Sequence, residues 1–348
     1  MLSMLTRDNL IYINLHFIQV FDTIFLDSSI YALKEKNGNY FKSNKGIYQR
    51  TLTQNTIEKV KSELSSYEQK KIFLDMKYIC SVEDNQLVEF KNLLVNILDN
   101  KNTLFLHNVS GEVWESLKKL GMDMKEEYDT DSRMFYITLP SIKYNKEDLI
   151  QMTQFATEIF EEKFERQLTK CCEKHERESM SSRVRLNIYI NIKKMMRDFP
   201  FFCYCIYKLA LELTELGVLN INHPEKNRDK TIFVHTMNSV VIGTIIAQLF
   251  CIDILLVDHL GPYNKLYVDD LSRTIDYKKK YLIVSDVVCM GTELSNAKTI
   301  LDVLGIHYNG CIALVNIVPI GTDSEDIYSL YIINKDKNIV NYRISTDL

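Results

Sequence analysis

The feature that most constrains this chain is one buried strand that leads through a small-residue turn into a helix. Residues Tyr281–Val284 form a continuous apolar run, Ser285 and Asp286 follow it, and Gly291-Thr292 precede a helical pattern. An unbroken apolar run is typical of a strand covered on both faces, as in a parallel sheet. The sequence therefore predicts a central parallel strand with Asp286 at its carboxyl end and a helix that begins near Gly291.

The helix after this turn has apolar residues at helical spacing and a glycine, Gly305, at its end. Its apolar positions are Leu294, Ala297, Ile300, Leu301 and Leu304. Backbone N–H groups and the dipole at a helix N-terminus bind phosphate, and a nearby acid can accept hydrogen bonds from ribose hydroxyls. The turn therefore suits a phosphorylated sugar. The alternative is an ordinary doubly wound sheet in which Asp286 merely precedes a helix.

The stretch resembles the phosphoribosyl-pyrophosphate (PRPP) motif of type I phosphoribosyltransferases, especially the orotate enzymes. Their pattern is an apolar strand, two acids, two apolar residues, and then Thr-Ala-Gly-Thr or Thr-Gly-Gly-Thr. The resemblance implies a Rossmann-like parallel-sheet domain, PRPP as substrate or effector, Mg²⁺ as a possible cofactor and Asp286 as a catalytic residue. It assigns PRPP or phosphate contacts to Asp286, Val287, Val288, Cys289, Met290, Gly291 and Thr292.

Four positions depart from the family pattern. Ser285 replaces the first acid, Cys289 the first threonine and Met290 the small residue, while Glu293 adds a negative charge where the 5′-phosphate is expected. Metal ions and ribose hydroxyls require negative charge nearby, so the loss of an acid weakens the case for catalysis. We therefore expect a related fold with reduced or lost transfer activity.

A second strand, loop and helix occupies Thr231–Thr244. In the family that the chain resembles, a loop at this place binds pyrophosphate through backbone N–H groups. The resemblance assigns this role to His235, Thr236, Asn238 and Ser239. The alternative is a common loop between a strand and a helix, with Ser239 as the N-cap.

The segment Asp258–Lys265 stands where orotate enzymes carry a mobile loop with lysines that stabilise departing pyrophosphate. Lys265 is therefore a candidate catalytic residue. The paired-lysine spacing of the family is absent, and a lysine that faces solvent is the simpler interpretation.

The N-terminal part predicts a separate α/β domain. Strands at Ile72–Leu74 and Thr103–His107 alternate with two helices, the first capped by Asp84 or Asn85 and the second by Asn108 or Ser110. Residues 1–25 are expected to form one or two strands. Over roughly residues 8–125 this part resembles STAS domains, but the turn Glu83-Asp84-Asn85 lacks the phosphorylatable hydroxyl of signalling members.

These patterns predict a STAS-like α/β domain over 1–140, a connecting helix over 141–178 and a phosphoribosyltransferase-like domain over 179–348. The connecting helix could also form a dimer interface. Cys171 and His175 lie on one face of it, but two further ligands for zinc are lacking, so no metal site is predicted there.

Composition narrows the class of protein. With 348 residues, 46% apolar content and a net charge of -4, the chain can form two cores and offers no basic surface for nucleic acid. Its eight scattered cysteines are typical of reduced thiols, and no signal peptide or membrane span is evident, so we expect a cytoplasmic protein.

Three functions remain open. The first is a divergent protein that binds PRPP or a nucleotide as a regulator or partner subunit, as a homodimer or with another protein. The second is an active phosphoribosyltransferase, a glycosyltransferase that moves phosphoribose to a base or other acceptor. The third is an interaction module without a ligand.

Overall fold

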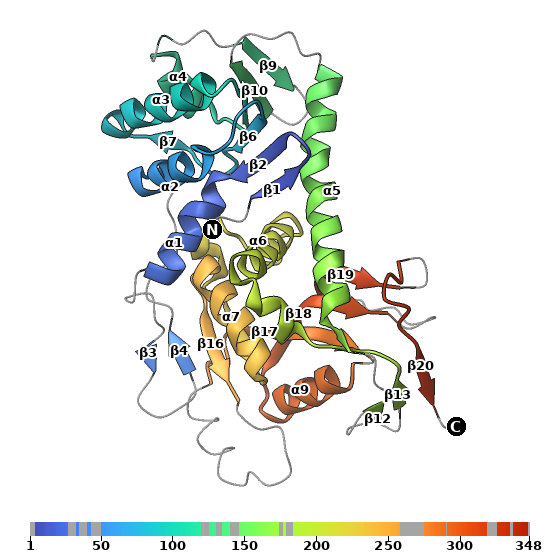
Figure 1. The fold of residues 1–348 in the computed structure, drawn as a ribbon. Coiled ribbons are helices and arrows are strands. Elements are labelled where there is room, and N and C mark those ends of the chain that lie inside the picture. Colours follow the sequence, from blue (N-terminus) through green and yellow to red (C-terminus); the bar gives the residue numbers. More distant parts are fainter. Residues whose placement is uncertain are drawn as a thin grey trace. The chain divides into compact units, whose positions relative to one another are not determined.

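The computed structural model describes residues 4–26, 33–34, 40–42, 50–119, 121, 125–129, 134–139, 146–173, 177–178, 184–257, 275–289, 291–318, 326–334 and 337–346. The chain forms two compact units (Figure 1). The first contains residues 1–25 and 48–164, and the second contains residues 26–47 and 165–348. The long helix α5 (Lys146–Cys171) contributes residues to both units.

The first unit is a mixed six-stranded sheet with helices. Strands β2, β6 and β8 run parallel, while β1, β10 and β9 are antiparallel to their neighbours, in the order β1-β2-β6-β8-β10-β9. The sheet strands are β1 (Leu5–Arg7), β2 (Leu10–Asn14), β6 (Lys71–Asp75), β8 (Thr103–His107), β9 (Lys125–Asp129) and β10 (Met134–Leu139). A short parallel pair, β5 (Thr51–Leu52) with β7 (Ser81–Val82), forms a separate two-stranded sheet. This confirms an α/β architecture, and the STAS resemblance stays a prediction.

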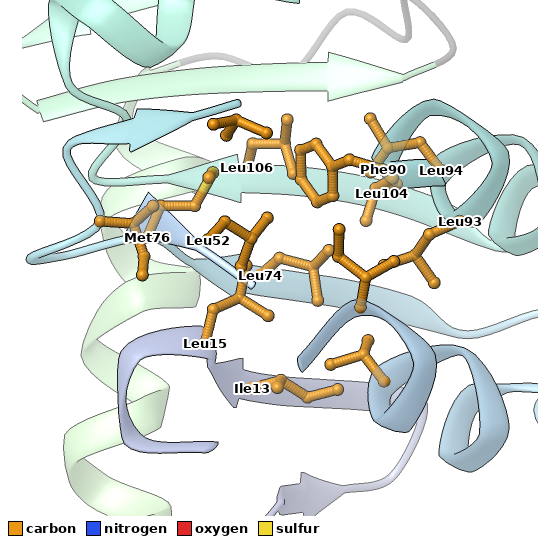
Figure 2. Packing of buried hydrophobic residues seen from close by; sticks show 14 of the residues in the cluster. Ile13, Leu15, Leu52, Leu74, Met76, Phe90, Leu93, Leu94, Leu104 and Leu106 are labelled. Atoms are coloured by element: carbon orange, nitrogen blue, oxygen red, sulfur yellow. The ribbon is translucent and has the colours of Figure 1, made fainter. Parts of the chain in front are cut away.

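Four helices of this unit share one apolar core with the strands of the sheet. They are α1 (Leu15–Leu26), α2 (Gln54–Leu64), α3 (Asp84–Asp99) and α4 (Gly111–Lys118). Figure 2 shows side chains of β2, β6 and β8 meeting those of α3, among them Ile13, Leu74, Leu106, Phe90 and Leu94. Ser110 caps α4 as one of the two predicted residues, since its hydroxyl accepts the N–H of Val113.

Two sequence predictions for this unit were wrong. Residues 15–25 form the helix α1 and not a strand, because the side-chain oxygen of Asn14 accepts the N–H of Phe17 and caps the helix start. The cap of α3 is Glu83, one residue before the predicted Asp84, and Glu83 makes no side-chain capping bond. Asp84 instead lies in the first turn, where the helix dipole favours an acid.

The second unit contains a seven-stranded sheet in the order β19-β18-β17-β15-β16-β4-β3, of which the first five strands are parallel. The strands are β15 (Lys230–Val234), β16 (Asp253–Leu256), β17 (Lys280–Cys289), β18 (His307–Ile317), β19 (Ile327–Ile333), β3 (Leu33–Lys34) and β4 (Tyr40–Lys42). The helices are α6 (Phe199–Glu215), α7 (Met237–Phe250) and α9 (Thr292–Val303). The prediction that 281–284 form a central parallel strand is confirmed.

The second unit also contains two small sheets of short strands. One pair is β11 (Cys172–Glu173) with β14 (Tyr189–Ile190), and a three-stranded sheet combines β12 (Arg177–Glu178), β13 (Val184–Leu186) and β20 (Ile344–Thr346). The pairing of Cys172 with Ile190 explains why α5 ends at Cys171, before the predicted end of the connecting helix at residue 178. No helix within the described ranges is long and apolar enough to cross a membrane.

Candidate functional site

The strand order of the second unit reverses between β15 and β17. Numbered along the chain, the five parallel strands β15 to β19 lie in the spatial order second, first, third, fourth, fifth. In such sheets the connections from the two strands at the reversal leave toward opposite faces, and ligands bind outside the carboxyl ends of these strands. The reversal therefore places the candidate site at the carboxyl edge of β15 and β17.

The two helices that follow these strands lie on opposite faces of the sheet. Gly243 of α7 packs on Ile232 and Val234, so closely that an added Cβ would lie 2.6 Å from the Val234 Cγ1 atom. Phe233 faces the other way, into a core cluster with Leu294 and other residues of α9. Since successive side chains of a strand alternate between faces, α7 and α9 flank the edge from both sides.

Strand β17 continues beyond the end of β15. The ladder between the two strands ends at Phe233 and Ile283, but β17 keeps pairing with β18 as far as Cys289 and Ile317. The prediction that the strand ends near Val284 was therefore too short by five residues, as the bounds of β17 show. The extension carries Asp286 past β15 and alongside the loop that leads into α7.

Asp286 and Asn238 meet across the reversal point. The Asn238 Nδ2 atom donates a hydrogen bond of 2.6 Å to the Asp286 Oδ2 atom. Both residues are half-buried. The structure thus brings together one residue from each of the two predicted loops, and it gives the carboxylate an amide donor in the place where ribose hydroxyls were expected.

The loop after β15 forms a capping box, and α7 begins at Met237 with Thr236 as its N-cap in place of the predicted Ser239. The Ser239 hydroxyl oxygen accepts the N–H groups of His235 and Thr236, and the Thr236 hydroxyl oxygen accepts the N–H of Ser239. These three backbone donors are therefore occupied within the loop. The N–H groups of Met237 and Asn238 belong to the first turn, which has no acceptor inside its own helix.

The N-terminus of α9 lacks a side-chain cap. Its N-cap is Gly291, whose φ of 71° lies in the left-handed region that glycine adopts without strain. Gly291 has no side chain that could accept the first N–H groups of the helix, so the N-cap makes no side-chain capping bond. Thr292 opens the helix and is half-buried. This uncapped terminus offers the donors and the positive dipole end that an anion requires.

Glu293 brings negative charge to the same terminus. Glu293 is exposed, yet the pKa of its carboxyl group lies above the ordinary value. The main cause is that neighbouring atoms remove part of its hydration, and the negative charge of Asp286 adds to the effect. Asp286 therefore acts electrostatically on Glu293. They repel each other, and both would repel a phosphate.

Ser285 does not replace the missing acid. It is buried, and its hydroxyl donates to the backbone oxygen of Val287 at 3.3 Å, so the group is directed at its own strand. Val288 is buried in the core cluster with α9, while Val287 is half-buried and pairs with Val315. The side chain of Val288 is therefore directed into the core and away from the edge.

Tyr342 is a residue of this region that the sequence analysis missed. Its Oη atom lies 2.8 Å from the Cys289 Sγ atom, within hydrogen-bond distance. Burial raises the pKa of the Cys289 thiol. Because Tyr342 is 53 residues away in sequence, no local pattern could have predicted the contact. Lys265 and Met290 lie outside the described residues.

His235 completes the described edge. Burial lowers the pKa of its imidazole, and the negative charge of Asp286 acts in the opposite direction. Together, His235, Asn238 and Asp286 come from two adjacent parallel strands and their loops, between the N-termini of α7 and α9.

Comparisons with known proteins give similar solved structures only. No family model matches the chain, and no curated protein matches it. An orotate phosphoribosyltransferase from Aeropyrum pernix is 14% identical, with a TM-score of 0.35, over 49% of this chain and 93% of that chain. An adenine phosphoribosyltransferase from Thermoanaerobacter pseudethanolicus is 17% identical, with a TM-score of 0.32, over 42% and 88%. A hypothetical protein from Neisseria gonorrhoeae with bound ppGpp is 14% identical, with a TM-score of 0.28, over 38% and 79%.

Proposed function

We propose that the second unit binds a phosphorylated ribose, PRPP or a nucleotide, at the carboxyl edge of β15 and β17. The observation that carries the proposal is the convergence of two helix N-termini and the carboxylate of Asp286 at the reversal of strand order. Helix N-termini bind phosphate groups, and a carboxylate between them can accept hydrogen bonds from ribose hydroxyls. A phosphorylated ribose has both phosphate groups and hydroxyls, so it can bind the helix N-termini and the carboxylate at the same time.

Transfer activity is expected to be low or absent. Ser285 contributes no charge, and its hydroxyl is directed at Val287. Asp286 is bonded to Asn238, so ribose hydroxyls must displace an amide donor before they reach it. A protein that binds PRPP without consuming it would serve as a regulator or as a partner subunit. Asp286 itself is retained, and this favours the active transferase as the second candidate.

A magnesium ion fits this proposal only together with the ligand. Mg²⁺ is commonly held by one or two carboxylates and by substrate phosphates, with several waters. The described part of the chain shows no group of three or more His, Cys, Asp or Glu residues that could hold a metal ion, so the phosphates of the ligand and water would supply most of its ligands. The ion would neutralise part of the diphosphate charge.

Thermal unfolding with PRPP and Mg²⁺ tests the binding. A ligand at about 100 times its Kd stabilises the native state by about 2.7 kcal/mol, so the melting temperature should rise. Asp286→Asn should remove most of this shift, whereas Asp302→Asn, the same change on the exposed side of α9, should keep it. A shift that survives in Asp286→Asn would place the ligand elsewhere, and no shift in the wild type would favour the interaction module.

An assay of pyrophosphate release separates a protein that only binds PRPP from an active transferase. The wild-type protein should bind PRPP but release little pyrophosphate with common bases as acceptors, because only one of the two acids of the family pattern is present. Rapid release that depends on Asp286 would establish the active transferase instead.

A further inference from the structure

His235 is a half-buried residue whose two ring nitrogens have no hydrogen-bond partner in the described part of the chain. Both of its ring nitrogens, Nδ1 and Nε2, are inaccessible to solvent, and neither makes a hydrogen bond with any described residue. A buried donor or acceptor without a partner destabilises the native state, and native proteins rarely keep such groups without a reason. A group of this kind at a candidate binding edge points to a partner that the ligand supplies.

The ring occupies a defined place on the edge. His235 follows β15 directly and lies two residues after Phe233, so both side chains belong to the face that α9 covers. The two rings are nearly parallel, with centroids 6.2 Å apart and an angle of 24°. The backbone N–H of His235 donates to Ser239, which fixes the residue against the cap of α7.

The charges around the ring are negative. The negative charge of Asp286 on β17 favours the protonated form of the ring, and the same charge raises the pKa of Glu293 on α9. No charged residue of α7 or β15 acts on the ring among the described residues, since the described part of α7 has no titratable side chain and Lys230 lies at the opposite end of its strand. A phosphate that enters this edge therefore meets two carboxylates.

We propose that His235 binds a phosphoryl oxygen of the ligand and takes up one proton from solvent as it does so, which makes the site selective for phosphate dianions or diphosphates over uncharged sugars. This inference rests on the proposed function. The neutral imidazole gains a proton, one N–H then donates to the phosphate oxygen, and the positive ring offsets the repulsion from Asp286 and Glu293. No covalent bond forms or breaks besides the N–H bond.

The proposal predicts a proton-linked affinity. In the free protein, burial keeps the ring mostly neutral near neutral pH, while a bound dianion favours the protonated form. Binding coupled to one proton strengthens as the pH falls, by at most about tenfold per pH unit. The effect should be greatest between about pH 6 and pH 7.5, where an imidazole titrates.

Calorimetry with inorganic pyrophosphate, and separately with ribose 5-phosphate, tests the proton uptake. Each titration is run in two buffers of different ionisation enthalpy, which gives the number of protons bound with the ligand. His235→Gln removes the ring, and His223→Gln is the matched control, because His223 is exposed in the same unit and pairs with Glu225. The wild type and His223→Gln should take up more protons than His235→Gln, by up to about one proton. Their affinity near pH 6.5 should be about tenfold higher.

A measurement on the unchanged protein guards against misfolding of the variant. Among the seven histidines, one imidazole resonance should titrate at higher pH after pyrophosphate is added. Equal proton uptake in the wild type and in a folded His235→Gln variant, or no change in any histidine titration on binding, would overturn the role of His235 and leave the proposed function intact. If neither pyrophosphate nor ribose 5-phosphate binds the wild type, the proposed function fails and this inference fails with it.

Discussion

At the scale of single residues, Glu293 should limit how tightly the edge binds an anion. It lies in the first turn of α9, and partial loss of hydration, followed by the negative charge of Asp286, raises the pKa of its carboxyl group. We expect Glu293→Gln to tighten the binding of ribose 5-phosphate. Two unit charges about 5 Å apart repel by roughly 3 kcal/mol at an effective dielectric constant near 20. Exposure reduces this to about 1 kcal/mol, or roughly fivefold in Kd.

Calorimetry near neutral pH checks this expectation, with Asp302→Asn as the control that removes a charge elsewhere on α9. Unchanged affinity in Glu293→Gln would mean that the phosphate does not reach the helix terminus. Weaker affinity would mean that the carboxylate helps to hold the ligand, for example through a metal ion, and would contradict the repulsion argument.

Buried histidines should make the first unit sensitive to acid. Burial lowers the pKa of His16 from 6.5 to about 4, while Asp75 raises it and Arg50 lowers it. Since the folded pKa is below the unfolded one, protonation opposes folding. The stability of this unit is therefore complete above about pH 6.5 and falls as the pH drops toward about 4, by up to about 3 kcal/mol. His107, whose pKa burial also lowers, adds to the loss.

Urea unfolding followed by tryptophan fluorescence measures this effect selectively, because the single tryptophan, Trp114, lies in the core of the first unit. The unfolding free energy should depend less on pH in His16→Gln than in the wild type. Asp75 is itself buried with four hydrogen bonds, from Tyr12, Asn14, Asn108 and the N–H of Lys77. Identical pH profiles in the two proteins would assign the acid sensitivity to other groups.

At the scale of the elements, the position of α7 depends on a glycine. A Cβ at Gly243 would lie 2.6 Å from Val234 Cγ1 and 3.1 Å from Ile232 Cγ2. Gly243→Ala should therefore push α7 away from β15 and destabilise the protein by about 1–3 kcal/mol, despite the better helix propensity of alanine. Calorimetric melting measures the cost.

The double variant Gly243→Ala/Val234→Ala provides the internal control. Val234→Ala removes the methyl group that the new Cβ would meet, so the double variant should lose less stability than the sum of the two single variants. Strict additivity would show that the close approach between helix and strand does not cause the destabilisation.

The elements also show what the sequence could and could not predict. Local patterns predicted β15, the start of α9 and the cap at Ser110, because apolar runs, glycine and hydroxyl residues act within a few positions. The length of β17 depends on its ladder with β18, and α1 depends on the cap at Asn14 within an apolar stretch that could form a strand. Such features are set by partners distant in sequence or by one side-chain bond, so the hydrophobic pattern misses them.

At the scale of the whole molecule, the candidate site belongs to one unit. His235, Asn238, Asp286 and Thr292 all lie in the second unit. The sequence named these residues, but it could not show that Asn238 donates to Asp286 or that the capping box occupies the N–H groups of His235, Thr236 and Ser239. These contacts arise from geometry across two loops. They convert a predicted pyrophosphate loop into one with fewer available backbone donors.

This location predicts where a ligand should protect the backbone. In hydrogen exchange with PRPP present, residues 235–240 and 286–294 should exchange more slowly, because the ligand contacts these loops and helix termini directly and local opening must then expel it. The core strands β6 and β8 of the first unit make no predicted ligand contact and should keep their exchange rates, apart from any effect of global stabilisation. Asp286→Asn should lose the protection and Asp302→Asn should keep it. Protection confined to the first unit would place the ligand there and refute the proposed site.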